Sequence, residues 1–162
     1  MNISLFLIGM LFLAFFIVPV IYIHRVQKNK GKKLLKHFAE LALENGIKIN
    51  DSDIWNENNC IGIDETNGKI FVLNKTDENE ETTQINLNDV NQCKLSPTYR
   101  KVKGDKSSGI TERIDIIFIL NEGNAEKVIN IYNINSGATI SEEPALAEKW
   151  FNRANEYIKK RK

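Results

Sequence analysis

The sequence predicts an α+β protein: an N-terminal transmembrane helix, a second helix, an antiparallel β-barrel or bent sheet, and a C-terminal capping helix. Three observations support this. Ile3–Ile23 contains no charged residue. Short β-branched runs follow around an Asn67-Gly68 turn, and the last twenty or so residues have apolar side chains at helical spacing. We expect three parts, namely an anchor over residues 1–25, a basic segment and helix over 26–46, and the β domain with its last helix over 47–162.

The first expected element is a membrane-spanning helix over Ile3–Ile23. As a helix this stretch would extend about 30 Å, the thickness of the hydrocarbon core of a bilayer. The alternative, a cleaved signal peptide, needs a basic start and a small-residue cleavage site, and the sequence offers neither. Basic residues follow only its C-terminal end, so the positive-inside bias predicts a single-pass protein of the inner cell membrane with its C-terminal domain in the cytoplasm. The lipid bilayer is then the expected partner of residues 3–23.

Basic residues after this stretch, and a second group further along, are candidates for contact with an anionic membrane surface. Each near-surface cation contributes about 1 kcal/mol to such contact, although the first group also serves simply as a topology signal. Residues 51–90, by contrast, hold ten acidic residues against two lysines. We expect the basic side to face lipid and the acidic hairpins to face a protein partner; charge separation without a role is the alternative. The candidate contact residues are Arg25, Lys28, Lys30, Lys32, Lys33, Arg100, Lys101, Lys103 and Lys106, with the tail Lys159–Lys162.

A second helix is predicted from about Lys32 to Asn45. Leu34, Phe38 and Leu41 follow the i, i+4, i+7 spacing of one buried helical face. Asn45-Gly46 supplies the left-handed residue that commonly ends a helix. This helix is expected to pack on the domain that follows.

Beyond this helix the apolar period changes to that of strands. Cys60–Asp64 and Lys69–Leu73 flank the Asn67-Gly68 turn, which is a strong hairpin signal because both turn residues tolerate positive φ. The further predicted strands are Thr83–Leu87, Val90–Leu95, Ile110–Leu120 and Lys127–Tyr132.

The chain is predicted to close with an amphipathic helix. Ser141 is a plausible N-cap, and the acidic residues after it favour the positive end of the helix dipole. A broad apolar face follows, which favours packing on the core over a partner groove. The residues of this face are Leu146, Ala147, Trp150, Phe151, Ala154, Tyr157 and Ile158.

The region Cys60–Lys160 resembles the pleckstrin-homology-like domain, here in a bacterial single-pass membrane protein. The resemblance depends on the order of the elements, the Asn67-Gly68 hairpin and Trp150 in the last helix. The resemblance implies a bent antiparallel barrel plugged by its last helix; an open sheet with two helices on one face is the competing architecture. In members that bind phosphoinositides the first hairpin is basic. Here the corresponding turn, Asp64–Lys69, is net acidic, which argues against that ligand.

The chemistry of the sequence favours no enzyme, cofactor or metal. Twenty-two basic residues balance 21 acidic ones, which argues against nucleic-acid binding. The nucleotide and zinc-hydrolase motifs are absent, the only histidines are His24 and His37, and the paired carboxylates lie in polar sequence where solvation is expected. Cys60 and Cys93 are expected to be buried and reduced, with a redox pair as the alternative.

These observations predict a membrane-tethered cytoplasmic interaction module without catalytic activity, which binds an unidentified protein partner and no nucleic acid. The alternative is a membrane-associated regulator that responds to a small ligand or, through Cys60 and Cys93, to an oxidant. Since fold does not fix function, the element order decides nothing between them.

Overall fold

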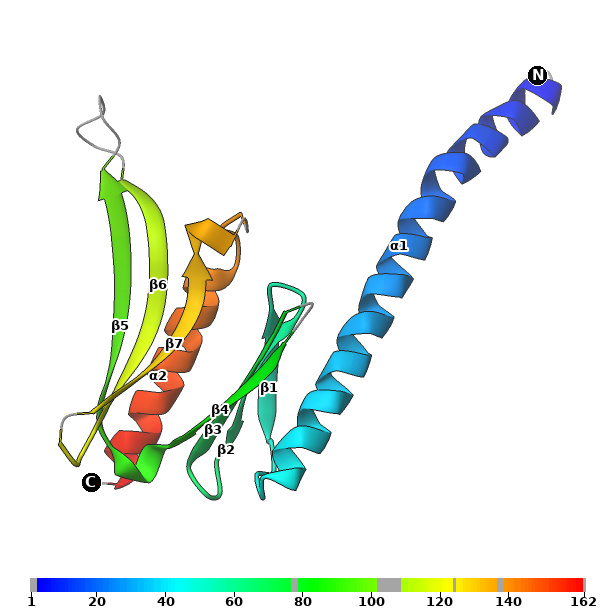
Figure 1. The fold of residues 1–162 in the computed structure, drawn as a ribbon. Helices are drawn as coiled ribbons and strands as arrows, with labels where there is room; N and C mark the ends of the chain where they lie inside the picture. Colours follow the sequence, from blue (N-terminus) through cyan, green and yellow to red (C-terminus); the bar gives the residue numbers. More distant parts are fainter. Residues whose placement is uncertain (1–2, 77–78, 102–108, 124, 137–138, 162) are drawn as a thin grey trace.

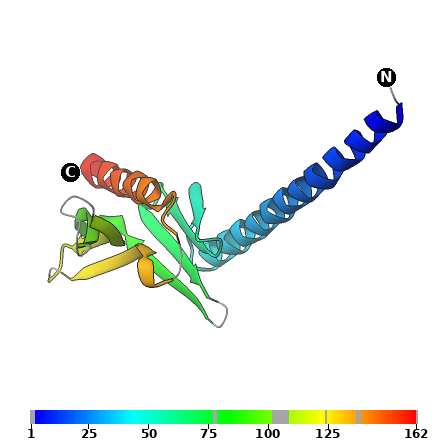
Figure 2. The same cartoon turned by 90° about the horizontal axis from the view of Figure 1, so that it is seen from above.

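The computed structural model describes residues 3–76, 79–101, 109–123, 125–136 and 139–161, with side chains undescribed at 3–14, 23, 24, 27 and 101. It is an α+β protein with two antiparallel sheets (Figures 1 and 2). The elements are α1 (Ile3–Glu44), β1 (Asp51–Trp55), β2 (Asn59–Asp64), β3 (Lys69–Lys75), β4 (Glu80–Asn86), the 3₁₀ turn η1 (Leu87–Asp89), β5 (Val90–Lys101), β6 (Gly109–Leu120), β7 (Glu126–Asn133), the 3₁₀ turn η2 (Ile134–Ser136) and α2 (Glu143–Arg161).

The strands form two separate sheets rather than the expected barrel or single bent sheet. The first sheet has the order β1-β2-β3-β4 and the second the order β5-β6-β7. Between them η1 turns the chain, and the Asn86 side chain stabilises this turn by accepting a hydrogen bond from the Asn88 backbone N–H. Among the described residues no ladder joins β4 to β5, so the barrel prediction is wrong. The competing arrangement, with both helices on one face of one sheet, is not found either.

The main core lies between the two sheets and α2. One face of β2 and β3 contributes Ile61, Ile63, Ile70 and Val72, all buried. The second sheet and α2 fill the rest, with Trp150 fully buried. The buried residues of α2 that belong to this core are Ala147, Trp150, Ala154 and Ile158, which confirms the predicted apolar face of the last helix.

A second, smaller cluster lies on the opposite face of the first sheet, where the C-terminal half of α1 packs. Phe38 of α1 meets Phe71 of β3 with ring centroids 5.6 Å apart, and Cys60 and Leu73 are buried beside them. Because side chains alternate across a strand, β2 and β3 are covered on both faces. Figure 1 shows α1 and the second sheet on opposite sides of the first sheet.

Gly62 of β2 allows this close approach of α1. A Cβ atom at this position would lie 2.8 Å from Cε1 of Phe38 and 3.0 Å from Cγ2 of Ile49. Such separations are shorter than van der Waals contact, so any larger residue at position 62 would push against the α1 side of the sheet.

The structure contradicts the prediction of a membrane-spanning helix over Ile3–Ile23. Residues 3–23 form the first part of α1, which continues unbroken to Glu44. Where its side chains are described, α1 passes from exposed apolar residues such as Phe15 and Tyr22 into exposed cations at Arg25 and Lys28. No helix within the described residues has both the length and the apolar character that crossing a membrane requires. The transmembrane helix and the single-pass membrane location inferred from it are therefore wrong.

The local turn predictions are confirmed. Gly46 has a φ of 68°, and beside it the Ile47 N–H donates to the Ala42 carbonyl at 2.8 Å, which ends α1. Gly68 has a φ of 64° in the β2–β3 hairpin. The later strands lie at the predicted places, with β5 longer than expected. A strand that the sequence did not predict, β1, forms the edge of the first sheet.

Candidate functional site

The turn between β1 and β2, Asn56–Asn58, lies between two clefts. One cleft opens toward α1 and the other toward α2, and Glu57 lines both. Asn56 and Glu57 have positive φ values of 49° and 61°. Asparagine tolerates this conformation, but for glutamate it is strained by about 1 kcal/mol. Strain of this kind often accompanies a functional surface, which makes both clefts candidate sites.

We call the cleft toward α1 the basic cleft. It encloses about 780 Å³ between α1, the β1–β2 turn and the end of β3. Three lysines and a histidine surround it, against one carboxylate, and its apolar wall consists of Leu34 and Ile54. The residues that line it are Lys30, Gly31, Lys33, Leu34, His37, Ile54, Glu57, Asn58 and Lys75.

Glu80 of β4 links α1 to β3 at this cleft. Its carboxylate lies 2.9 Å from Nε2 of His37 and 3.3 Å from Nζ of Lys75. The hydrogen bond from His37, opposed by burial and assisted by Lys75, holds the pKa of Glu80 below its usual 4.5. Lys30 and Lys33, by contrast, have no ion-pair partner in the described part of the chain and are exposed.

The structure divides the predicted surface cations between different places. Lys30 and Lys33 line the basic cleft, while Arg25, Lys28 and Lys32 are exposed on α1 outside its lining. Arg100 lies on β5 and forms an ion pair of 2.5 Å with Glu112. Figure 1 shows the first sheet between β5 and α1. Lys101 ends β5 without a described side chain, Lys103 and Lys106 lie outside the described residues, and the described part of the tail, Lys159–Arg161, is exposed at the end of α2.

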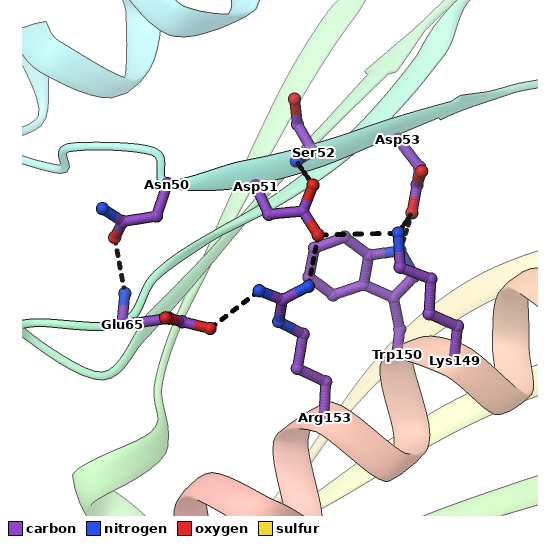
Figure 3. Close-up of polar contacts among 8 residues, drawn as sticks. All are labelled: Asn50, Asp51, Ser52, Asp53, Glu65, Lys149, Trp150 and Arg153. Carbon is purple, nitrogen blue, oxygen red and sulfur yellow. Dashed lines mark hydrogen bonds and ion pairs between the residues drawn. The ribbon is translucent and has the colours of Figure 1, made fainter.

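An ion-pair cluster joins β1 to α2, far apart in the sequence (Figure 3). Lys149 contacts Asp53 at 2.6 Å, and the Trp150 indole N–H donates to the same carboxylate at 2.8 Å. Arg153 bridges Asp51 and Glu65, the latter at 2.7 Å. These carboxylates were expected to be solvated, but they hold α2 against the first sheet. Asp51 and Asp53 are two residues apart, which places both carboxylates on one face of a strand. This spacing was the sequence signal from which the cluster could have been predicted.

The pKa directions in this cluster follow from the pairing. Burial opposes ionisation of Asp51, but Lys149 and Arg153 outweigh it and hold its pKa below the usual 3.8. The hydrogen bond from Lys149 to Asp53 raises the pKa of Lys149, and that from Arg153 to Glu65 raises the pKa of Arg153. All three groups therefore stay charged near neutral pH, and the cluster is occupied by its own contacts.

Asp64 is a fully buried carboxylate with a structural role. It accepts hydrogen bonds from the Lys48 backbone N–H at 3.0 Å and from the side chain and backbone of Asn67 at 2.8 and 3.0 Å. Burial raises its pKa, but these hydrogen bonds outweigh burial and the net pKa lies below 3.8. Asp64 thus fixes the β2–β3 turn and the segment that follows α1.

The two cysteines lie in different clusters. Cys60 is buried between α1 and the first sheet, and Cys93 is buried in the main core. Both are free, and burial raises the pKa of each thiol to about 12. The structure therefore does not bring the candidate redox pair together, and neither thiol forms a reactive thiolate near neutral pH.

No family model, no curated protein and no solved structure matches this chain. Within the described residues, no group of three or more histidine, cysteine, aspartate or glutamate side chains is placed to hold a metal ion.

Proposed function

We propose that the chain is an interaction module that binds an acidic segment of a protein partner in the basic cleft. One observation carries the proposal: Lys30 and Lys33 are exposed at the cleft and form no ion pair among the described residues, while Leu34 and Ile54 give the same cleft an apolar wall. An acidic segment with an apolar side chain is complementary to this arrangement.

The frame of the cleft supports a binding role because its walls are fixed before any partner arrives. Phe38 is fully buried one turn beyond Leu34, and His37 is tied to β4 through Glu80. A preformed surface loses little conformational freedom on binding, which favours affinity. Since charge complementarity acts mainly on association rate and specificity, the apolar wall supplies the remaining affinity.

The proposal includes no catalytic step. The carboxylates that could serve as acids or bases near α2 are engaged by Lys149, Trp150 and Arg153, and Asp64 is held by backbone donors. The alternative of a redox-responsive regulator receives no support from the separate burial of Cys60 and Cys93.

We also propose that the part of the chain after α1 is a pleckstrin-homology-like domain. Four antiparallel strands, three further antiparallel strands and a last helix with a buried Trp150 support the resemblance seen in the element order. The two sheets remain unpaired at β4 and β5 within the described residues, so the resemblance concerns the order and stacking of the elements rather than a closed barrel.

The test is a binding measurement with a defined acidic probe. A fluorescein-labelled peptide of alternating glutamate and leucine is titrated with the full chain at low salt, and anisotropy is recorded. The triple variant Lys30→Gln, Lys33→Gln, Lys75→Gln is expected to bind about tenfold or more weakly, because each lost charge pair contributes up to about 1 kcal/mol.

A variant with the same change of charge provides the control. Lys94, Lys159 and Lys160 are exposed and do not line the basic cleft, so their triple change to Gln is expected to leave the affinity within about twofold. Equal loss of affinity in both variants, or none in either, would contradict the proposal, since binding would then follow net charge or another surface.

A further inference from the structure

The first sheet ends in two edge strands, β1 and β4. An edge strand presents a row of backbone N–H and C=O groups to which another extended segment can add as a further strand. Within the described residues, no strand pairs with the outer side of β1. The direction of each backbone group decides which of them a partner can reach.

Two hydrogen bonds show which residues of β1 direct their backbone groups away from β2. The Asn50 N–H donates to the Ile63 carbonyl at 2.8 Å, so this carbonyl points from β2 toward the β1 side. The Ser52 N–H donates to Oδ1 of its neighbour Asp51 at 2.9 Å (Figure 3). Because the direction alternates along an antiparallel strand, the backbone groups of Ser52 and Ile54 point outward from the sheet.

The opposite edge of the sheet agrees with this alternation and is partly closed. One row of facing residues across the four strands consists of Ser52, Gly62, Phe71 and Gln84. The alternation turns the Gln84 carbonyl outward on β4, and this carbonyl accepts a hydrogen bond from Nζ of Lys127 on β7 at 2.7 Å. A lysine of the second sheet thus protects the β4 edge. No corresponding side-chain contact reaches the Ile54 backbone within the described residues.

Clefts lie on both sides of Ile54, so the edge of β1 is open there. The basic cleft lies toward α1, a cleft of about 610 Å³ lies toward α2, and Ile54 lines both. A Cβ atom at Gly31 of α1 would lie 3.5 Å from Cδ1 of Ile54. A segment that runs along β1 at Ile54 would therefore pass beside the turn of α1 that carries Lys30 and Lys33.

We propose that the acidic partner segment binds as an extended strand, paired with the Ser52 carbonyl and with the N–H and C=O of Ile54. This inference rests on the proposed function, because the basic cleft supplies the charge preference, and it adds the conformation of the segment. A helical segment could not pair in this way, since its own backbone groups are bonded internally.

The strand conformation also defines a sequence preference. Alternate side chains of a strand point to opposite faces, so every second residue of the segment would lie on the α1 side of the edge. Lys30 and Lys33, which form no ion pair among the described residues, lie on that side. An acidic residue at every second position is therefore preferred over the same residues in one run.

The experiment compares three peptides of alternating glutamate and leucine, which compete with the fluorescein-labelled peptide for the full chain at low salt. One is unmodified, one is N-methylated at every leucine, and one is N-methylated at every glutamate. N–H groups of neighbouring residues in a strand point to opposite sides, so each methylated peptide lacks the donors of one side only. One of the two is expected to bind at least about tenfold more weakly, because two hydrogen bonds to β1 are lost, and the other within about threefold of the unmodified peptide.

Amide hydrogen exchange of the ¹⁵N-labelled full chain locates the pairing. The Ile54 N–H is expected to exchange at least about tenfold more slowly when the unmodified peptide is present at saturation. Thr82 is the control, because the same alternation directs its backbone outward on β4. Its exchange is expected to stay unchanged.

The proposed function and this inference fail in different ways. Peptide binding that does not depend on Lys30 and Lys33 would contradict the proposed function. Binding that depends on these lysines but is equal for both methylated peptides, or leaves Ile54 unprotected, would overturn the strand inference alone and would indicate a segment held by its side chains. Equal protection of Thr82 and Ile54 would also overturn it, since the whole sheet would then have changed.

Discussion

The basic cleft and the cleft toward α2 share the β1–β2 turn and differ in the helix that completes them. Toward α1 the shared residues Ile54 and Glu57 meet Lys30 and Lys33; toward α2 they meet Glu142 and Glu143. The shared turn therefore borders both clefts, and the residues at each helix supply the sign of the charge. Two surfaces of opposite charge thus border one hairpin, and each depends on the helix that is packed beside it.

The largest effect on stability is expected for Phe38, which packs α1 against the first sheet. Phe38→Ala removes a fully buried ring that packs on Phe71, and the resulting cavity is expected to lower the free energy of unfolding by about 3–5 kcal/mol. Urea unfolding measures this change, with Leu43→Ala as the control because Leu43 is 62% exposed on the same helix. A similar small effect of both substitutions would mean that α1 does not form a fixed wall.

The next largest effect on stability is expected for Asp53, which joins β1 to Lys149 and Trp150 of α2. Asp53→Ala leaves the buried Trp150 indole N–H without its acceptor and Lys149 without its closest partner, which is expected to lower the free energy of unfolding by about 1–3 kcal/mol. Glu148→Ala, an exposed change on the same helix, is the control and should differ from the wild type by less than about 0.5 kcal/mol. If Asp53→Ala is equally silent in urea unfolding, the cluster does not hold α2.

A smaller effect of the opposite sign is expected at the shared turn. Glu57→Gly relieves the strain of a φ of 61° and is expected to raise the free energy of unfolding by about 0.5–1 kcal/mol. Asn58→Gly serves as the comparison because no strained φ is relieved there, and thermal unfolding should show it as neutral or destabilising. Destabilisation by Glu57→Gly would show that the left-handed conformation is held without strain.

The smallest effect concerns the pH dependence of the link between α1 and β4. Glu80→Gln is expected to lower the free energy of unfolding by less than about 1 kcal/mol at pH 7, because the pair with His37 is partly exposed. The pKa of Glu80 is lowered in the folded chain, so this contribution is complete above the usual 4.5 and is lost as pH falls through the lowered pKa. Urea unfolding of both chains at several pH values should show the two converging in acid; a constant difference would contradict this assignment.

The sequence predicted those features that depend on neighbouring residues. Asn45-Gly46 and Asn67-Gly68 identified a helix end and a hairpin because positive φ is a local requirement, and both glycines adopt it. The apolar face of α2 was likewise visible, since helical spacing places Trp150 and Ala154 on one side.

Features that depend on distant residues were missed or misread. The strand β1 begins with Asp51, Ser52 and Asp53, whose polarity suggests a loop until α2 supplies Lys149 and Arg153 as partners. The basic cleft was likewise beyond reach, because Lys33 and Lys75 come together only when α1 packs on the first sheet. The barrel prediction was wrong because turn and strand patterns do not specify which strands pair, and β4 and β5 do not pair within the described residues.

The glycine beneath Phe38 has a consequence for evolution of the basic cleft. Position 62 lines neither cleft, but a side chain there would press on Phe38 of α1, the helix that carries Lys30 and Lys33. A substitution there would displace α1 without altering any residue that lines the basic cleft. The thickness of the segment that the proposed site accepts could therefore change through a single methyl group on the α1 side of the sheet.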